Sequence, residues 1–380
     1  MIKTILFDVD GVLLSEEHYF DASALTVWEM LISKNYLGLM PDQFKTNYSE
    51  TEIAAIRENV FNNDTVLELQ KSRGLNANWD MIYLTFCYQL IHLLSQVKES
   101  ESKQIEQWLG KEINRKALLE IAAVLSKYTV TLNFGLFNED FQKSAETKQG
   151  LMDHLNVLAY EKLGIETTVF SGKGALWSEC EHASQEWYVG DEHIVASTGR
   201  PSVQLGKKGF LANEATTCPS QEMGKLFQYL INMGISIGIG TGRPELETVQ
   251  PFIHLDWLKY FDGNHIVTAD DVLKAENEVP KGMSLSKPNP FTYVMALLGK
   301  QHTSSECIQT KLPLEKGNEV LIVGDSLADL LAAREMGCLF AAVLTGLSGQ
   351  DARSEFEENG AEYILDTVVE VKDLVDSFKD

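Results

Sequence analysis

Basic residues, paired cysteines and long apolar runs are all scarce in this chain of 380 residues. Its 32 Lys and Arg residues stand against 55 Asp and Glu residues, which gives a formal net charge of −23. Such an acidic surplus disfavours nucleic acid and anionic membrane surfaces as partners. A site for a phosphorylated molecule must therefore be local, supplied by a metal, a lysine or backbone N–H groups.

The cysteines are few, odd in number and without C-x-x-C spacing: Cys87, Cys180, Cys218, Cys307 and Cys338. This pattern favours reduced packing thiols and argues against a zinc site. No stretch reaches the length of a membrane-spanning helix, and the N-terminus opens on a strand-like run without the features of a signal peptide. We therefore expect a cytoplasmic protein.

The two ends of the chain have the pattern of an α/β domain. Short apolar runs predict strands at 2–9, 235–240, 319–323, 339–344 and 363–365. Amphipathic or apolar segments between them predict helices at 223–233, 290–298 and 327–336. Short strands that alternate with helices indicate a Rossmann-like parallel sheet covered on both faces.

The middle of the chain has a different texture, with apolar residues at helical spacing. Helices are predicted at 20–33, 52–62, 79–97, 116–127 and 148–163. Residues 171–210 combine glycines and aromatic residues without a clear period, so we expect loops and short elements there. A chain of this length suits more than one domain. We predict an α/β core from 1–15 and 206–380, with a mostly helical domain, 16–205, inserted after the first strand.

The first predicted strand delivers two aspartates, Asp8 and Asp10, to a turn at Gly11. Like charges raise each other's proton affinity, so an acidic pair after a buried strand is costly. The pair indicates a metal site, or a nucleophile beside an acid. Taken alone, it is also compatible with an ordinary Asp-Gly turn.

Three more polar motifs follow predicted core elements in order: Thr241-Gly242-Arg243, Ser286-Lys287-Pro288 and Gly324-Asp325-Ser326-x-x-Asp329. Each has an ordinary structural interpretation: a glycine-rich turn, a surface lysine at a helix entry, and a helix cap. In an open α/β sheet, however, ligands bind at the carboxyl ends of strands. We therefore expect these motifs to meet the acidic pair.

Taken together, the four motifs resemble those of the haloacid dehalogenase superfamily. The resemblance implies that Asp8 is the nucleophile that forms an aspartyl-phosphate, and that Asp10 is the general acid and base. It implies that Thr241 and Lys287 hold phosphoryl oxygens and also act in catalysis, with Gly242 and Arg243 beside them. The acid at Asp10 resembles phosphatases and phosphomutases rather than dehalogenases, which do not need it.

The resemblance also implies a magnesium ion. Its protein ligands would be Asp8, Asp325 and the backbone carbonyl of Asp10, with Asp329 as a direct or indirect ligand. Mg²⁺ keeps waters and substrate phosphate in its octahedron and so needs few carboxylates.

The long insertion before Thr241 resembles the helical cap called C1 in this superfamily and implies a small, soluble phosphorylated substrate. Side chains that could contact it are Ser15, Glu16, His18, Tyr19, Arg57, Lys173 and Arg200. The leading function is a magnesium-dependent phosphatase. A sugar phosphomutase, a carbon–phosphorus hydrolase and a catalytically silent binding or regulatory protein on the same fold are the alternatives.

Overall fold

The computed structural model describes residues 1–75, 77–280 and 283–378. The chain divides into two compact units, one formed by Met1–Glu17 with Leu211–Asp380 and the other by His18–Phe210. The boundaries expected from the sequence, after residues 15 and 205, fall slightly earlier than those of the two units. We call the first unit the core and the second the helical unit. Among the described residues, no helix has the combined length and apolarity needed to cross a bilayer.

The core contains one parallel sheet with the strand order β3-β2-β1-β4-β5-β6. Its strands are β1 (Thr4–Phe7), β2 (Ser236–Gly240), β3 (Ile266–Val267), β4 (Val320–Gly324), β5 (Leu339–Val343) and β6 (Tyr363–Leu365). The α/β fold with a parallel sheet and a large helical insertion, as predicted from the sequence, is confirmed. The short strand β3 was not predicted.

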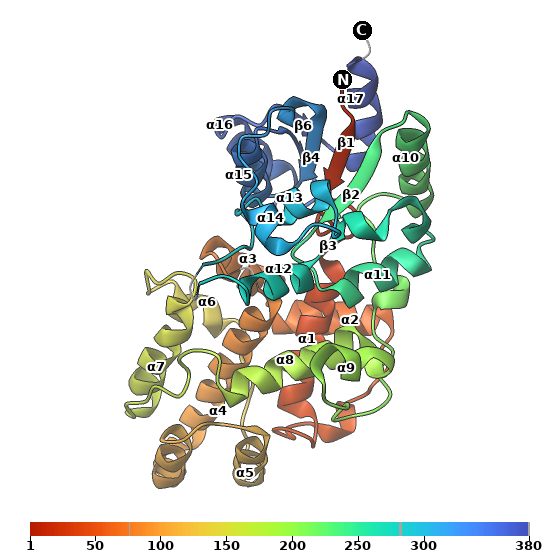
Figure 1. The fold of residues 1–380 in the computed structure, drawn as a ribbon. Helices are drawn as coiled ribbons and strands as arrows, with labels where there is room; N and C mark the ends of the chain where they lie inside the picture. The colour runs from red at the N-terminus through yellow and green to blue at the C-terminus, as the bar shows by residue number, and fades with distance from the viewer. Residues whose placement is uncertain (76, 281–282, 379–380) are drawn as a thin grey trace. The chain divides into compact units, whose positions relative to one another are not determined.

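Both faces of this sheet are covered, because successive side chains of a strand point to opposite faces. In β1, Ile5 and Phe7 join one apolar cluster and Leu6 joins another. The core helices are α10 (Ser220–Asn232), α11 (Glu245–His254), α12 (Ala269–Glu276), α13 (Phe291–Leu298), α14 (Ser304–Ile308), α15 (Leu327–Met336), α16 (Arg353–Glu358) and α17 (Val371–Ser377). Helices α10, α11 and α17 pack against the first face, and α12 to α16 against the second (Figure 1).

The helical unit is built around its own apolar cluster, centred on the long helix α4. Its helices are α1 (Glu17–Ile32), α2 (Glu50–Val60), α3 (Thr65–Ser72), α4 (Asn78–Leu109), α5 (Arg115–Leu125), α6 (Leu136–Phe141), α7 (Gly150–Leu163), α8 (Ala175–Tyr188) and α9 (Gly190–Thr198). The five helices predicted from apolar spacing all correspond to helices in this unit.

The expectation of loops and short elements over residues 171–210 was wrong for Ala175–Thr198, where helices α8 and α9 follow one another. Helix α8 buries polar side chains, among them His182, Gln185 and Glu186, beside its apolar ones. A helix that buries its polar residues shows no clean apolar period, which is why the sequence pattern did not predict it.

The buried polar residues of α8 belong to a charged cluster inside the helical unit. Lys207 Nζ lies 2.7 Å from Glu29 Oε2 and 2.5 Å from Glu186 Oε2, and none of the three side chains is exposed to solvent. Trp187 Nε1 also donates to Glu29 Oε2, at 2.8 Å. Burial would raise the pKa of Glu186, but hydrogen bonds from His182 and Lys207, with the lysine charge, hold it at about 2.

We expect Lys207→Met to lower the free energy of unfolding of the helical unit by about 3–5 kcal/mol, because it leaves buried carboxylates without their cation. All tryptophans except Trp257 lie in residues 18–210, so urea denaturation followed by tryptophan fluorescence reports mainly on this unit. The neighbouring, exposed Lys208→Met is the matched control and should change the value little. An equal effect of both substitutions would contradict the assigned role of Lys207.

Candidate active site

The predicted motifs meet at one edge of the core sheet. Strand β1 lies between β2 and β4, with Phe7 in register with both Ile239 and Val323. Asp8 follows β1 directly, Thr241 follows β2 and Asp325 follows β4. Because the strands are parallel, their carboxyl ends bring these residues to the same edge.

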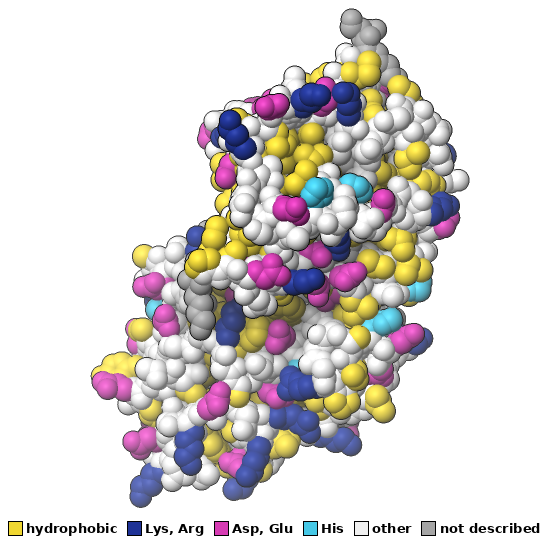
Figure 2. All heavy atoms as spheres, in the orientation of Figure 1, with side chains coloured by type: hydrophobic (Ala, Val, Ile, Leu, Met, Phe, Trp, Pro, Cys, Tyr) yellow, Lys and Arg dark blue, Asp and Glu magenta, His cyan; other side chains and the backbone are white. Residues whose placement is uncertain are grey.

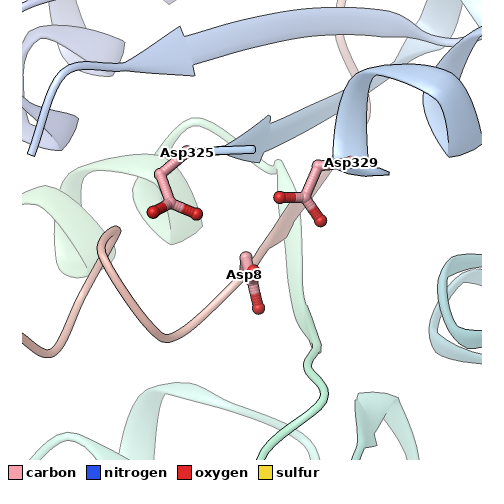
Figure 3. Close-up of side chains that lie close together, drawn as sticks. All are labelled: Asp8, Asp325 and Asp329. Atoms are coloured by element: carbon pink, nitrogen blue, oxygen red, sulfur yellow. The ribbon is translucent and has the colours of Figure 1, made fainter. Parts of the chain in front are cut away.

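Three carboxylates converge there. Among the described residues, Asp8, Asp325 and Asp329 each offer an oxygen within 4.8 Å of the others, and Figure 3 shows the three side chains facing a common space. Lys287 Nζ lies 2.9 Å from Asp8 Oδ1 and 2.8 Å from Asp329 Oδ1. The three carboxylates and one ammonium therefore carry an excess of negative charge, unless the group gains protons or a further cation.

This excess of negative charge contributes to raised pKa values of both Asp8 and Lys287. Burial raises the pKa of Asp8 to about 7 despite the nearby Lys287, and the charges of Asp329 and Asp10 add to the rise. Burial would lower the pKa of Lys287, but Asp329 and Asp8 raise it above its usual value, so the ammonium form is stable. In the absence of a further cation, Asp8 thus holds a proton more readily than an ordinary aspartate.

Asp325 is the carboxylate with the least support from the chain. Among the described residues it has no hydrogen-bond or ion-pair partner, and burial, followed by the charges of Asp8 and Asp329, raises its pKa well above the usual value. It lies in a slot between two glycines, where a Cβ on Gly11 or Gly346 would come within 2.0 or 2.1 Å of Asp325 Oδ2. An unpaired carboxylate beside two others is a donor set that fits a small divalent cation.

Asp329 is held from several sides. Tyr293 donates its hydroxyl to Asp329 Oδ1 at 2.7 Å, and Ser326 donates to Oδ2 at 2.6 Å. Lys287 Nζ also donates to the Tyr293 hydroxyl, at 3.1 Å. Tyr293, on helix α13, was not predicted as a site residue. The feature of the sequence that could have identified Tyr293 is its position shortly after Lys287. The apolar pattern of the helix, however, predicts a core residue at this position.

Asp10 faces an arginine. Arg243 Nε donates to Asp10 Oδ1 at 2.8 Å, and Nη2 lies 2.7 Å from the same oxygen. The buried guanidinium also donates from Nη1 to the Glu247 carbonyl at 3.1 Å, and Nη2 lies 3.5 Å from Glu214 Oε1. The expectation for Arg243 was phosphate binding. In this structure its guanidinium holds Asp10, and Glu214 was not predicted at all.

Thr241 and Gly242 lie beside these groups with different exposure. Thr241 is fully buried, and its hydroxyl oxygen accepts from Arg243 N at 3.1 Å. Gly242 is exposed, and a Cβ there would meet nothing within 4 Å. In the turn after β2, the Thr241 hydroxyl is therefore buried in the core, whereas Gly242 borders open space.

The side chains suggested as substrate contacts in the insertion make contacts within the helical unit. Arg57 Nη2 pairs with Asp64 at 2.8 Å, Lys173 lies 3.5 Å from Asp80, and Arg200 lies 3.3 Å from Glu179. Aromatic stacking engages two more candidates, with His18 on Phe210 and Tyr19 on Tyr188. In the core, Ser15 N donates to the Ala215 carbonyl at 2.8 Å. A role for any of them in binding substrate stays a prediction.

We expect Arg243→Met to lower the free energy of unfolding of the core by about 3–5 kcal/mol, because it removes the cation from a buried charged group. The matched control is Arg353→Met, which breaks an exposed pair with Asp366 and should cost less than about 1 kcal/mol. Native-state hydrogen exchange of the β1, β2 and β4 amides measures both. If both substitutions lowered the free energy of unfolding equally, the buried charge of Arg243 would not stabilise the core more than an exposed ion pair does.

The comparisons with known proteins agree with this fold. Residues 2–337 match the family of haloacid dehalogenase-like hydrolases. A crystal structure from a structural genomics consortium is 37% identical and has a TM-score of 0.90, with 99% of each chain covered. No curated protein matches the chain.

Two structures are much less similar. A putative β-phosphoglucomutase from Thermotoga maritima is 13% identical, with a TM-score of 0.42 and 99% of each chain covered. CbbY from Rhodobacter sphaeroides, in complex with phosphate, is 15% identical, with a TM-score of 0.39 and 98% of this chain and 96% of that chain covered. Neither score supports an argument about function. On the match across most of its length, the chain belongs to the haloacid dehalogenase-like hydrolase family.

Proposed function

We propose that this protein is a magnesium-dependent phosphatase that hydrolyses a small phosphorylated metabolite through an aspartyl-phosphate on Asp8. The observation that carries the proposal is the position of the Asp8 carboxylate. It follows β1 at the carboxyl edge of the sheet, 2.9 Å from Lys287 Nζ and within the acidic cluster with Asp325 and Asp329. Phosphoryl transfer depends mainly on positioning and on neutralising charge, and both are available at this point.

In the proposed reaction an Asp8 oxygen attacks the phosphorus atom, and the bond from phosphorus to the leaving oxygen breaks. Lys287 stays charged because of its two carboxylate partners, so it can offset the negative charge of the phosphoryl oxygens. Tyr293 and Asp329 orient the lysine toward Asp8. Water then attacks the phosphorus of the aspartyl-phosphate, and the bond from phosphorus to the Asp8 oxygen breaks, which releases inorganic phosphate and regenerates the Asp8 carboxylate.

The residues that would hold magnesium are Asp8, Asp325 and the backbone carbonyl of Asp10. The fit rests on the unpaired Asp325 carboxylate and on the excess of carboxylates over ammonium groups in the cluster. A bound magnesium ion would offset the repulsion between Asp8 and an incoming phosphate. Both oxygens of Asp329 already accept hydrogen bonds from the chain, so Asp329 is better suited to hold Lys287 than to serve as a ligand.

Asp10 would exchange protons with the leaving oxygen and with water. Arg243 can only donate hydrogen bonds, so it orients Asp10 as an acceptor, the state in which a carboxylate removes a proton from water. Donation of a proton to the leaving oxygen requires Asp10 to carry that proton.

We expect Asp8→Asn to lower magnesium-dependent hydrolysis of an aryl phosphate by about 10³-fold or more, since the amide cannot replace the nucleophile. Release of the aryl alcohol measures the rate, and the exposed Asp351→Asn in the same unit is the control. Unchanged activity in Asp8→Asn would exclude Asp8 as the nucleophile.

A panel of phosphorylated metabolites then separates the neighbouring functions. Release of free phosphate supports a phosphatase, whereas an isomerised sugar phosphate identifies a phosphomutase. Absence of magnesium-dependent turnover on the aryl phosphate and on the whole panel would refute the enzymatic proposal. It would favour a binding or regulatory role.

We expect Gly346→Ala to raise the magnesium concentration needed for half-maximal activity at least about tenfold, because hard-cation sites depend on carboxylate placement. The new methyl group would lie 2.1 Å from Asp325 Oδ2 and must displace that carboxylate. Gly263→Ala, where a Cβ meets nothing within 4 Å, is the control. If both variants keep the normal magnesium dependence, Asp325 does not take part in metal binding.

A further inference from the structure

The helical unit contains a pocket of about 420 Å³ that the proposed reaction does not use. It is lined by residues of α5, of α8 and of the segment after α9: Arg115, Lys116, Leu119, Glu179, His182, Arg200, Pro201 and Val203. All of them belong to His18–Phe210. A volume of this size suits a small metabolite.

The pocket is basic in an otherwise acidic chain. Arg200 is balanced, because its Nη1 lies 3.3 Å from Glu179 Oε1 and its Nη2 donates to the Ser178 carbonyl at 3.0 Å. Arg115 and Lys116 are not balanced, since neither forms an ion pair with any residue that the structure describes. Figure 2 shows Lys and Arg side chains gathered on the surface near α5 and α8. The lining thus carries two uncompensated positive charges.

The position of these two cations on α5 is itself unfavourable. Asn114 caps the helix by accepting from Ala117 N at 3.1 Å, so Arg115 and Lys116 occupy its first turn, where no acidic residue is present. The N-terminus of a helix carries partial positive charge and repels nearby cations. An anion in the pocket would relieve this repulsion and would interact favourably with both side chains and with the helix terminus.

The part of the lining that α8 contributes is fixed. His182 is buried, and its Nδ1 lies 3.1 Å from Thr198 Oγ1 while its Nε2 lies 3.1 Å from the Pro201 carbonyl. His182 Nε2 is also 3.3 Å from Glu186 Oε1, which joins this part of the lining to the buried cluster around Lys207. A lining held by buried polar contacts keeps its shape before a ligand arrives, which lowers the ordering cost of binding.

We propose that this pocket binds a small organic anion with at least two negative charges, such as a polycarboxylate or a phosphate ester. Its charged groups contact Arg115 and Lys116, with Arg200 at the edge, and its carbon skeleton lies against Leu119 and Val203. Guanidinium groups match the planar geometry of carboxylate and phosphate oxygens, which favours these ligands over simple halides. The proposal is independent of the reaction at Asp8.

The proposal is tested by isothermal titration calorimetry, in which citrate or inorganic phosphate is titrated into the full-length, metal-free protein. The test variant is Arg115→Gln with Lys116→Gln. Its control is Lys103→Gln with Lys127→Gln, which removes the same charge from exposed positions outside the pocket. We expect the test variant to bind at least one probe at least tenfold more weakly than the unmodified protein, and the control variant to bind it with unchanged affinity. Added salt should weaken binding to the unmodified protein.

A second variant, Leu119→Glu, keeps both cations but adds a carboxylate to the lining, and should weaken binding to a similar degree. Citrate binding identifies a carboxylate site, and phosphate binding that depends on Arg115 and Lys116 identifies a phosphate site. Absence of binding of both probes to the unmodified protein would overturn the proposal. Equal weakening in the test and control variants would overturn it too, because it would reflect overall charge alone.

Discussion

The contact of the Lys287 ammonium with two carboxylates is the interaction on which the core site depends. Asp8 comes from the end of β1, Asp329 from the first turn of α15 and Lys287 from the segment before α13, so one cation joins three separate parts of the core. Without it, the carboxylates would repel one another and gain protons. With it, the cluster still has an excess of negative charge, and that excess makes a divalent cation a suitable partner.

Much of this arrangement could be predicted from the sequence, because it follows from strands that end in polar residues. The apolar runs located β1, β2 and β4, and a parallel sheet brings their carboxyl ends to one edge. Strand β3, formed by Ile266–Val267, is too short to leave an apolar pattern. Apolar runs in the sequence therefore predict which strands the site residues follow, but they do not predict every strand of the sheet.

The partners of the site residues were harder to predict, because they depend on side-chain direction. Arg243 follows Thr241 closely, which suggested a ligand-binding role, but its guanidinium is directed to Asp10 and Glu247. Gly346 has no side chain, so no chemical pattern marks it, although its bare backbone makes room for Asp325. Sequence motifs identify reactive groups well, and identify the groups that position them poorly.

The helical unit shows the same limit in its interior. Lys207, in a segment without helical or strand pattern, has the sequence context of a surface lysine, yet its side chain is fully buried between Glu29 and Glu186. Burying a charge is costly unless a partner of opposite sign accompanies it. Here the partners come from α1 and α8, far apart in the sequence, so the cluster fixes how those helices pack.

The segments that lead into and out of the helical unit are paired with each other within the core. Ser15 N donates to the Ala215 carbonyl at 2.8 Å, and Thr217 N donates to the Leu13 carbonyl at 3.2 Å. Among the residues that the structure describes, the apolar clusters of the core use none from His18–Phe210. In topological terms the whole helical unit is one long loop closed at its base. Such a loop can be exchanged, lengthened or shortened without rethreading the sheet, so the strand ends that carry Asp8, Thr241 and Asp325 can stay unchanged while the helical unit varies.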